Sequence, residues 1–155
     1  MTTDLFVGLH EGLCQVHRTL LDAFTRAFAV PDAHAAARFL LAHHAIESEV
    51  LFTGLRRAGR LRSTDVAFLD ARDREHHALH RIVEHILASN EPSVVIALAG
   101  ETLGLLAAHT AEEEAGLAPD RLRTIVDEPG LAAILQDADR ARDRLLASGQ
   151  VQGIR

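Results

Sequence analysis

The sequence contains no tryptophan and no tyrosine, and it has one cysteine. A lone cysteine, Cys14, cannot close an internal disulfide, which is typical of a protein from a reducing compartment. Lysine is also missing, because all 16 basic residues are arginine, and the formal net charge is −6. Acidic side chains are spread along the chain and leave no basic stripe that could follow a phosphate backbone. The composition therefore excludes nucleic acid as an expected partner.

The sequence also lacks the signals of secretion and membrane insertion. Residues 1–4 have neither the positive charge nor the apolar stretch of a secretory signal, and we expect no run of about 18 apolar residues that could span a membrane. The sequence thus predicts a cytoplasmic protein with no membrane partner.

What the chain has is helical periodicity over most of its 155 residues. Apolar residues recur every three or four positions in four segments that are separated by proline and glycine. Each segment is followed by a short connection, as in an antiparallel bundle. The segments are residues 4–29, 32–59, 63–89 and 93–117, and a further amphipathic helix is expected near 131–147. We predict an all-α fold, an up-down-up-down antiparallel four-helix bundle with an additional C-terminal helix. It forms a single domain over residues 1–155, with the bundle at about 4–118 and the tail at about 120–155.

Two of these segments carry a histidine followed four residues later by a glutamate. His43 and Glu47 project together from the second helix, on the face that Phe39, Ile46 and Val50 define as inward. The same face excludes His44 and Glu49. In the fourth helix, His109 and Glu113 share the face of Val95, Leu98, Leu105 and Leu106. A buried carboxylate without a partner is costly, so two such pairs require an explanation.

The other two helices contribute histidines alone. In the third helix the apolar residues place His76 inside and His80 at the edge of the core. In the first helix His10 and His17 are both inward. A rise of about 1.5 Å per residue puts His17 level with the second-helix pair, which favours it, and His10 stays open as the alternative.

Convergence of these side chains favours a metal site. One inward histidine is usually an ordinary hydrogen-bonded core residue, but a set drawn from four helices is not explained in that way. Imidazole and carboxylate ligands together suit iron, manganese or zinc, and carboxylates from opposite helices can bridge two ions. The pattern therefore predicts one dinuclear centre. Its expected ligands are His17, His43, Glu47, His76, His80, His109 and Glu113.

The motifs resemble those of hemerythrin-like (HHE) cation-binding domains. That family has a first-helix His, a second-helix His-x-x-x-Glu, a third-helix Glu-His and a fourth-helix His-x-x-x-Glu. The matching residues are His17 or His10, His43 with Glu47, Glu75-His76, and His109 with Glu113. The resemblance implies two non-haem iron ions that are joined by an oxo or hydroxo bridge. Manganese or zinc could take the place of the iron. Oxygen-carrying hemerythrins instead place an Asp five residues after the fourth-helix His, so the match is with the wider family.

The resemblance also sets the functional expectation. Oxygen, peroxide or nitric oxide would be the small ligand, and the protein would be a carrier, a sensor or a di-iron oxidoreductase. The absence of tyrosine and tryptophan disfavours a radical mechanism. Glu49, Glu75 and Glu112 are candidates for hydrogen bonds to the ligand histidines. The pattern leaves the catalytic residues, the substrate and the oligomeric state open.

Overall fold

The computed structural model describes residues 3–149, and within them every regular element is a helix. This confirms the all-α class. The elements are α1 (Leu5–Thr25), α2 (Val30–Ile46), a π-helix η1 (Glu47–Phe52), α3 (Thr53–Arg57), α4 (Ser63–Ala88), α5 (Pro92–Gly116), α6 (Pro119–Ile125) and α7 (Glu128–Ala147).

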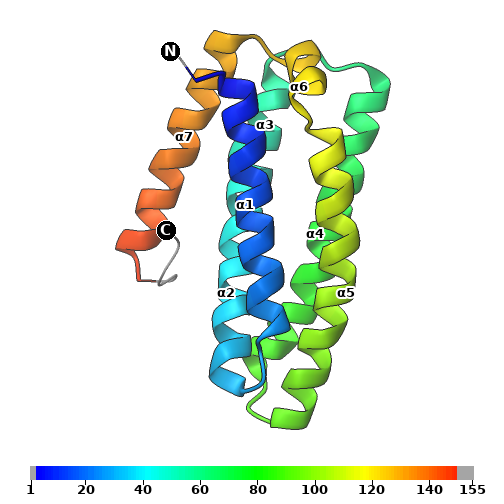
Figure 1. Cartoon of the computed structure of the whole chain (residues 1–155), viewed down its shortest axis with the longest axis vertical. Helices are drawn as coiled ribbons and strands as arrows, with labels where there is room; N and C mark the ends of the chain where they lie inside the picture. Colours follow the sequence, from blue (N-terminus) through cyan, green and yellow to red (C-terminus); the bar gives the residue numbers. More distant parts are fainter. Residues whose placement is uncertain (1–2, 150–155) are drawn as a thin grey trace.

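The four long helices α1, α2, α4 and α5 lie side by side along the long axis of the molecule (Figure 1). Contacts join α1 to α2, α2 to α4, α4 to α5 and α5 back to α1, which is the packing expected of a bundle. The short helix α6 lies at one end. Helix α7 packs outside the four, against α1, α2 and η1.

Buried apolar side chains form two clusters, one toward each end of the bundle. One contains Leu20, Leu40 and Leu106, and the other contains Leu13, Leu69 and Leu117. Along every long helix the buried histidines and glutamates fall between members of the two clusters. The buried histidines and glutamates therefore occupy a polar layer that separates two apolar cores.

The structure corrects the inward face that the sequence predicted for the second helix. Phe39, Ile46 and Val50 are only partly buried, and α2 instead buries a face of small residues and leucine. Ile46 and Val50 lie beside α7, so the second apolar face of this helix is the one that α7 covers. In α5, Leu105 was also expected to be inward and is 46% exposed.

The segment predicted as one helix over 32–59 is interrupted by the π-helix that begins at Glu47. Its wider turn lets the Thr53 hydroxyl donate to the Ser48 carbonyl at 2.9 Å. Isolated π-helical turns within α-helices are frequent at functional sites. The hydrophobic pattern of the sequence does not indicate this π-helix, because one extra residue in a helical turn leaves the composition unchanged.

Within residues 3–149, α5 is the one helix long and apolar enough to cross a membrane, judged by length and composition alone. The expectation that no such stretch exists is wrong here, because the run reaches this length and hydropathy although Ser93, Glu101 and Thr102 interrupt it. Core helices of bundles share this length and composition. Helix α5 also buries His109 and Glu113.

The start of α4 depends on Asp65, which is buried and accepts hydrogen bonds from the Arg62 backbone N–H at 2.9 Å and its guanidinium at 3.0 Å. These bonds hold the pKa of Asp65 below its ordinary value. We expect Asp65→Ala to lower the free energy of unfolding by about 1 to 2 kcal/mol at pH 7. Asp22→Ala, which removes an exposed ion pair with Arg26, should change it by less than about 0.5 kcal/mol.

Urea unfolding at several pH values measures this difference. A group whose pKa is lowered by folding stabilises the protein above its unfolded pKa of about 3.9 and loses that effect as the pH falls through the folded value. The gap between the wild type and Asp65→Ala should therefore close in acid. A gap that stays constant down to about pH 2 would contradict the assignment.

Candidate metal centre

The centre of the polar layer contains two fully buried carboxylates, Glu47 at the start of η1 and Glu113 on α5. They are 2% and 0% exposed, and none of their four oxygens has a hydrogen-bond partner among the described residues. Burying an ionised carboxylate without hydrogen bonds is strongly unfavourable unless a cation compensates it. A positive charge next to these two side chains would therefore stabilise the protein.

Imidazole nitrogens from α1, α2, α4 and α5 surround the two carboxylates. Glu47 Oε1 lies 2.7 Å from His43 Nε2 and 3.5 Å from His17 Nε2, while its Oε2 lies 3.3 Å from His76 Nε2. Glu113 Oε2 lies 3.0 Å from His109 Nε2 and 3.8 Å from His17 Nε2. The contacts of Glu47 with His43 and His17 are close without being aligned as hydrogen bonds. Each carboxylate thus faces histidines from more than one helix.

Two overlapping groups of side chains could each hold a metal ion, and Glu47 belongs to both. The donor atoms in each group lie within 4.8 Å of one another. First-row ions hold nitrogen and oxygen ligands at about 2.0–2.2 Å, so neighbouring ligand atoms are expected about 3 Å apart. The separations above agree with that spacing. One group is His17, His43 and Glu47, and the other is His44, Glu47, His76 and His109.

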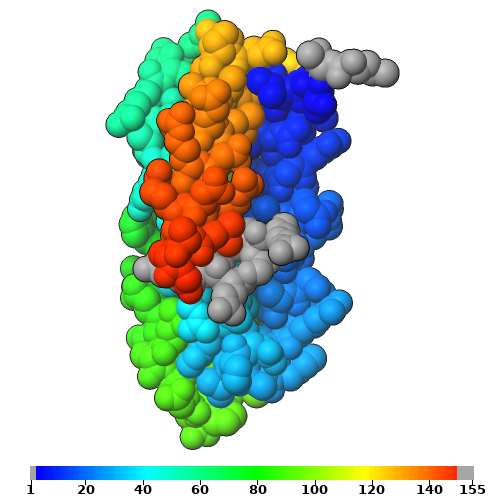
Figure 2. All heavy atoms as spheres, turned by 90° about the vertical axis from the view of Figure 1, so that its left-hand side faces the viewer, coloured from blue at the N-terminus to red at the C-terminus, as the bar shows by residue number. Residues whose placement is uncertain are grey.

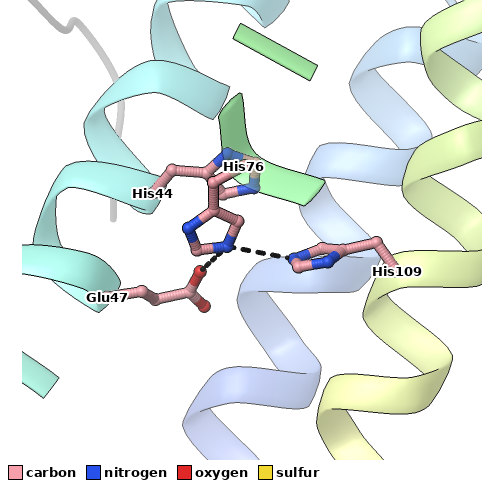
Figure 3. A group of neighbouring side chains, drawn as sticks. All are labelled: His44, Glu47, His76 and His109. Atoms are coloured by element: carbon pink, nitrogen blue, oxygen red, sulfur yellow. Dashed lines mark hydrogen bonds and ion pairs between the residues drawn. The ribbon is translucent and has the colours of Figure 1, made fainter. Parts of the chain in front are cut away.

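Figure 3 shows the second group, in which His76 points toward both Glu47 and His109. The Nε2 atoms of His76 and His109 are 3.1 Å apart. If both rings carry their proton on Nδ1, two lone pairs face each other across this gap. A cation between them would turn that repulsion into attraction.

In their neutral form, three rings are held by their outer contacts in the tautomer that leaves Nε2 free. His17 Nδ1 donates to Glu114 Oε1 at 2.9 Å, and His109 Nδ1 donates to Glu75 Oε2 at 2.6 Å, because a carboxylate can only accept. His76 Nδ1 lies 2.8 Å from the Ser48 hydroxyl, which donates in turn to Asp73. Such outer contacts orient metal-ligating histidines and raise their basicity.

The Glu75 carboxylate is itself held in place by a buried arginine. Arg72 donates to Glu75 at 2.8 Å and to Glu112 at 2.9 Å, and its guanidinium lies over the ring of Phe68. Glu75 and Glu112 therefore belong to one chain of contacts that ends at His109. Glu49, the third candidate from the sequence, is exposed.

Charge at the site is balanced between carboxylates and imidazoles. Burial raises the pKa of Glu47, but His43, His17 and His76 outweigh it and hold the pKa well below its ordinary value. Burial lowers the pKa of His17, but Glu47, Glu113 and Glu114 together raise it above the ordinary value, and the pKa of His109 is raised in the same way, chiefly by Glu113. The site thus attracts cations, whether protons or metal ions.

The structure brings together six of the residues predicted from the sequence: His17, His43, Glu47, His76, His109 and Glu113. It places His10 apart from them, with Nε2 3.0 Å from the Glu114 carbonyl oxygen and a contact to the Cys14 sulfur. His80 is partly buried, and its Nε2 lies 3.2 Å from His44 Nδ1. His80 belongs to neither group, and it contacts the second one only through His44.

The sequence analysis missed His44, which it assigned to the outside and which is 1% exposed. Its ring stacks on His76 with centroids 3.8 Å apart, and burial together with His76 lowers its pKa well below the ordinary value. The error follows from the inward face chosen for α2. Glu114 was also not among the residues that the sequence singled out, yet its carboxylate accepts a hydrogen bond from His17. Leu40, one turn before His44, lies on the true inward face, but Phe39, Ile46 and Val50 indicate a competing one.

Comparison with protein-family models, with curated proteins and with solved structures finds no match to this chain. The geometry of the site shows buried His/Glu groups that could hold metal.

Removing the charge of the shared carboxylate should strongly weaken metal binding. We expect Glu47→Gln to weaken binding of Fe²⁺ or Zn²⁺ by well over tenfold, and the unfolding temperature to lose its dependence on added metal. The matched control is Glu49→Gln, two residues away and exposed, which should behave like the wild type. Metal content after dialysis and thermal unfolding measure both effects. Equal metal content in the two variants would contradict the role of Glu47.

The outer hydrogen bonds should matter less than the inner carboxylates. Glu75→Gln weakens the acceptor for His109 Nδ1, and we expect metal affinity to fall by about 10- to 100-fold with the helix content unchanged. Glu84→Gln on the exposed face of the same helix provides the control. Competition with a chromophoric chelator measures the affinities. A Glu75→Gln affinity equal to that of Glu84→Gln would show that this contact does not support the site.

Proposed function

We propose that the chain is a hemerythrin-like non-haem di-iron protein that binds or reacts with oxygen, peroxide or nitric oxide in the core of an up-down-up-down antiparallel bundle. The observation that carries the proposal is the position of Glu47, whose two oxygens face different histidines from different helices. A carboxylate placed in this way suits a bridge between two ions. A cytoplasmic location and small-molecule ligands remain part of the proposal.

Each ion would have its own set of side chains. His17 and His43 with Glu47 Oε1 would hold one, and His76 and His109 with Glu47 Oε2 would hold the other. Glu113 Oε2 faces both His17 and His109 and could serve as a second bridge. His44 would complete the second set, and His80 would either orient His44 or take its place.

The donor set favours iron as the occupant. Imidazole-rich sites with carboxylate bridges suit iron, with zinc and manganese as substitutes, and neither group contains a thiolate. When bound, a ferrous pair supplies electrons and an open coordination position for a small diatomic molecule or peroxide. The protein's own groups would hold the imidazoles in the Nε2-free tautomer and balance charge through Glu75, Glu114 and Asp73.

A second candidate, a di-iron oxidoreductase, is favoured by one specific observation. A cavity of about 460 Å³ between α1, α2, η1 and α7 reaches His43 and Glu47. A carrier of a diatomic gas has no need of a cavity this large, whereas an enzyme that oxidises an organic substrate does.

Loading with ⁵⁷Fe tests the proposal directly. We expect two iron ions per chain and a Mössbauer spectrum of the oxidised protein in which the two ferric ions are magnetically coupled. The spectrum of a single isolated iron, or well under one metal per chain, would sink the dinuclear assignment.

Exposure of the ferrous protein to air separates the two candidates. A reversible charge-transfer band supports a carrier or sensor. Rapid irreversible oxidation, or oxygen evolution after peroxide is added, supports the oxidoreductase.

A further inference from the structure

The cavity that reaches the metal centre has an apolar body. Leu9, Leu13 and Val16 line it from α1, Phe39 from α2, and Ile134 and Leu135 from α7. Its volume of about 460 Å³ lies in the range of small-molecule sites, about 300–1,000 Å³. Figure 2 shows the outside of this region, with α7 at the front, and α7 contacts α1, α2 and η1. The cavity therefore lies between α7 and the helices α1 and α2.

Two glycines of α1 leave space in this cavity because they have no side chain. Gly8 and Gly12 both line the cavity, one turn apart, and a Cβ atom at Gly12 would meet nothing within 4 Å. Gly8 is partly buried and Gly12 is exposed, so larger side chains at these positions would enter the cavity from its open side. Glycine inside a helix lowers its stability by about 1 kcal/mol relative to alanine, so its presence at two such positions has a cost.

The two ends of the cavity differ in charge. At the inner end lie His43 and Glu47, and the Glu47 carboxylate is buried and has no hydrogen-bond partner among the described residues. At the outer end the Arg142 guanidinium lies 3.3 Å from Asp139, so the rim offers a cation that is already paired. Burying a charge of either sign against this apolar body is unfavourable, and the lining arginine, Arg142, is already paired with Asp139. The lining therefore selects an uncharged, largely apolar molecule.

We propose that this cavity is the binding site for an uncharged apolar organic molecule, comparable in size to a medium-chain alcohol or a compound of two to three rings, and that it delivers one end of that molecule to the metal position beside His43 and Glu47. The inference rests on the proposed function for its metal. It deepens that function by naming the class of substrate.

Fluorescence titration with the uncharged dye N-phenyl-1-naphthylamine tests the cavity without any metal. The chain has no tryptophan or tyrosine, so the dye is read against little protein emission. Binding to the metal-free protein should saturate and be displaced by 1-octanol. Gly12→Leu and Ala138→Leu, which fill the cavity from opposite walls, should each weaken binding at least about tenfold, as expected when about two methylene groups of the occupant lose their contacts.

The matched control is Gly104→Leu on α5. A Cβ atom at Gly104 also meets nothing within 4 Å, and this residue does not line the cavity. Its dye affinity should equal that of the wild type. Equal affinities in Gly12→Leu and Gly104→Leu would overturn the proposal. If the wild type sediments as a dimer and the cavity variants sediment as monomers, a second copy of the chain occupies this cavity. That result would overturn the proposal too.

Proximity to the metal is tested with 1-octanol and protein loaded with Mn²⁺ or Zn²⁺. We expect faster relaxation of the octanol protons with Mn²⁺ than with Zn²⁺ in the wild type, and no difference in Gly12→Leu. If octanol binds to protein that holds Mn²⁺ but its protons do not relax faster, delivery to the metal is contradicted. The metal site itself would remain supported. If metal analysis instead finds no bound ion, the proposed function fails first, and delivery fails with it.

Discussion

Two buried carboxylates that lack hydrogen bonds are the constraint on which the rest of this structure depends. Glu47 and Glu113 sit in the middle of the bundle, where an uncompensated charge would outweigh much of a domain's net stability. Histidines from all four long helices point their Nε2 atoms toward these oxygens. The centre is therefore a place where positive charge, from protons or from a metal ion, would stabilise the fold.

The surrounding structure keeps this arrangement in place. Apolar clusters on both sides of the polar layer fix the helices relative to one another, and a wider helical turn begins at the shared glutamate. Glu75, Glu114 and Ser48 hold the outer nitrogens of three rings, so the inner lone pairs converge. The same helices leave room beneath α7 for an apolar molecule. Site and cavity thus meet at Glu47.

The helices and most of the site could be predicted from the sequence because helical periodicity and i,i+4 spacing are local properties. His43 with Glu47 and His109 with Glu113 follow from such spacing, and their burial agrees with it. His44 could not be predicted in this way, because α2 has two apolar faces and only the position of α7 shows which one is the core. The π-helix at Glu47 and the contact of Glu114 with His17 depend on packing between helices, which periodicity does not contain. His80 shows the same limit, since its distance from the centre depends on the rotation of α4.

The most direct test of a shared carboxylate is crystallographic. Anomalous diffraction at the iron edge from crystals of the iron-loaded protein should show two peaks on opposite sides of the Glu47 carboxylate, about 3.5–4 Å apart. One peak should lie beside His17 and His43, and the other beside His76 and His109. A single peak, or peaks that do not contact Glu47, would contradict the account.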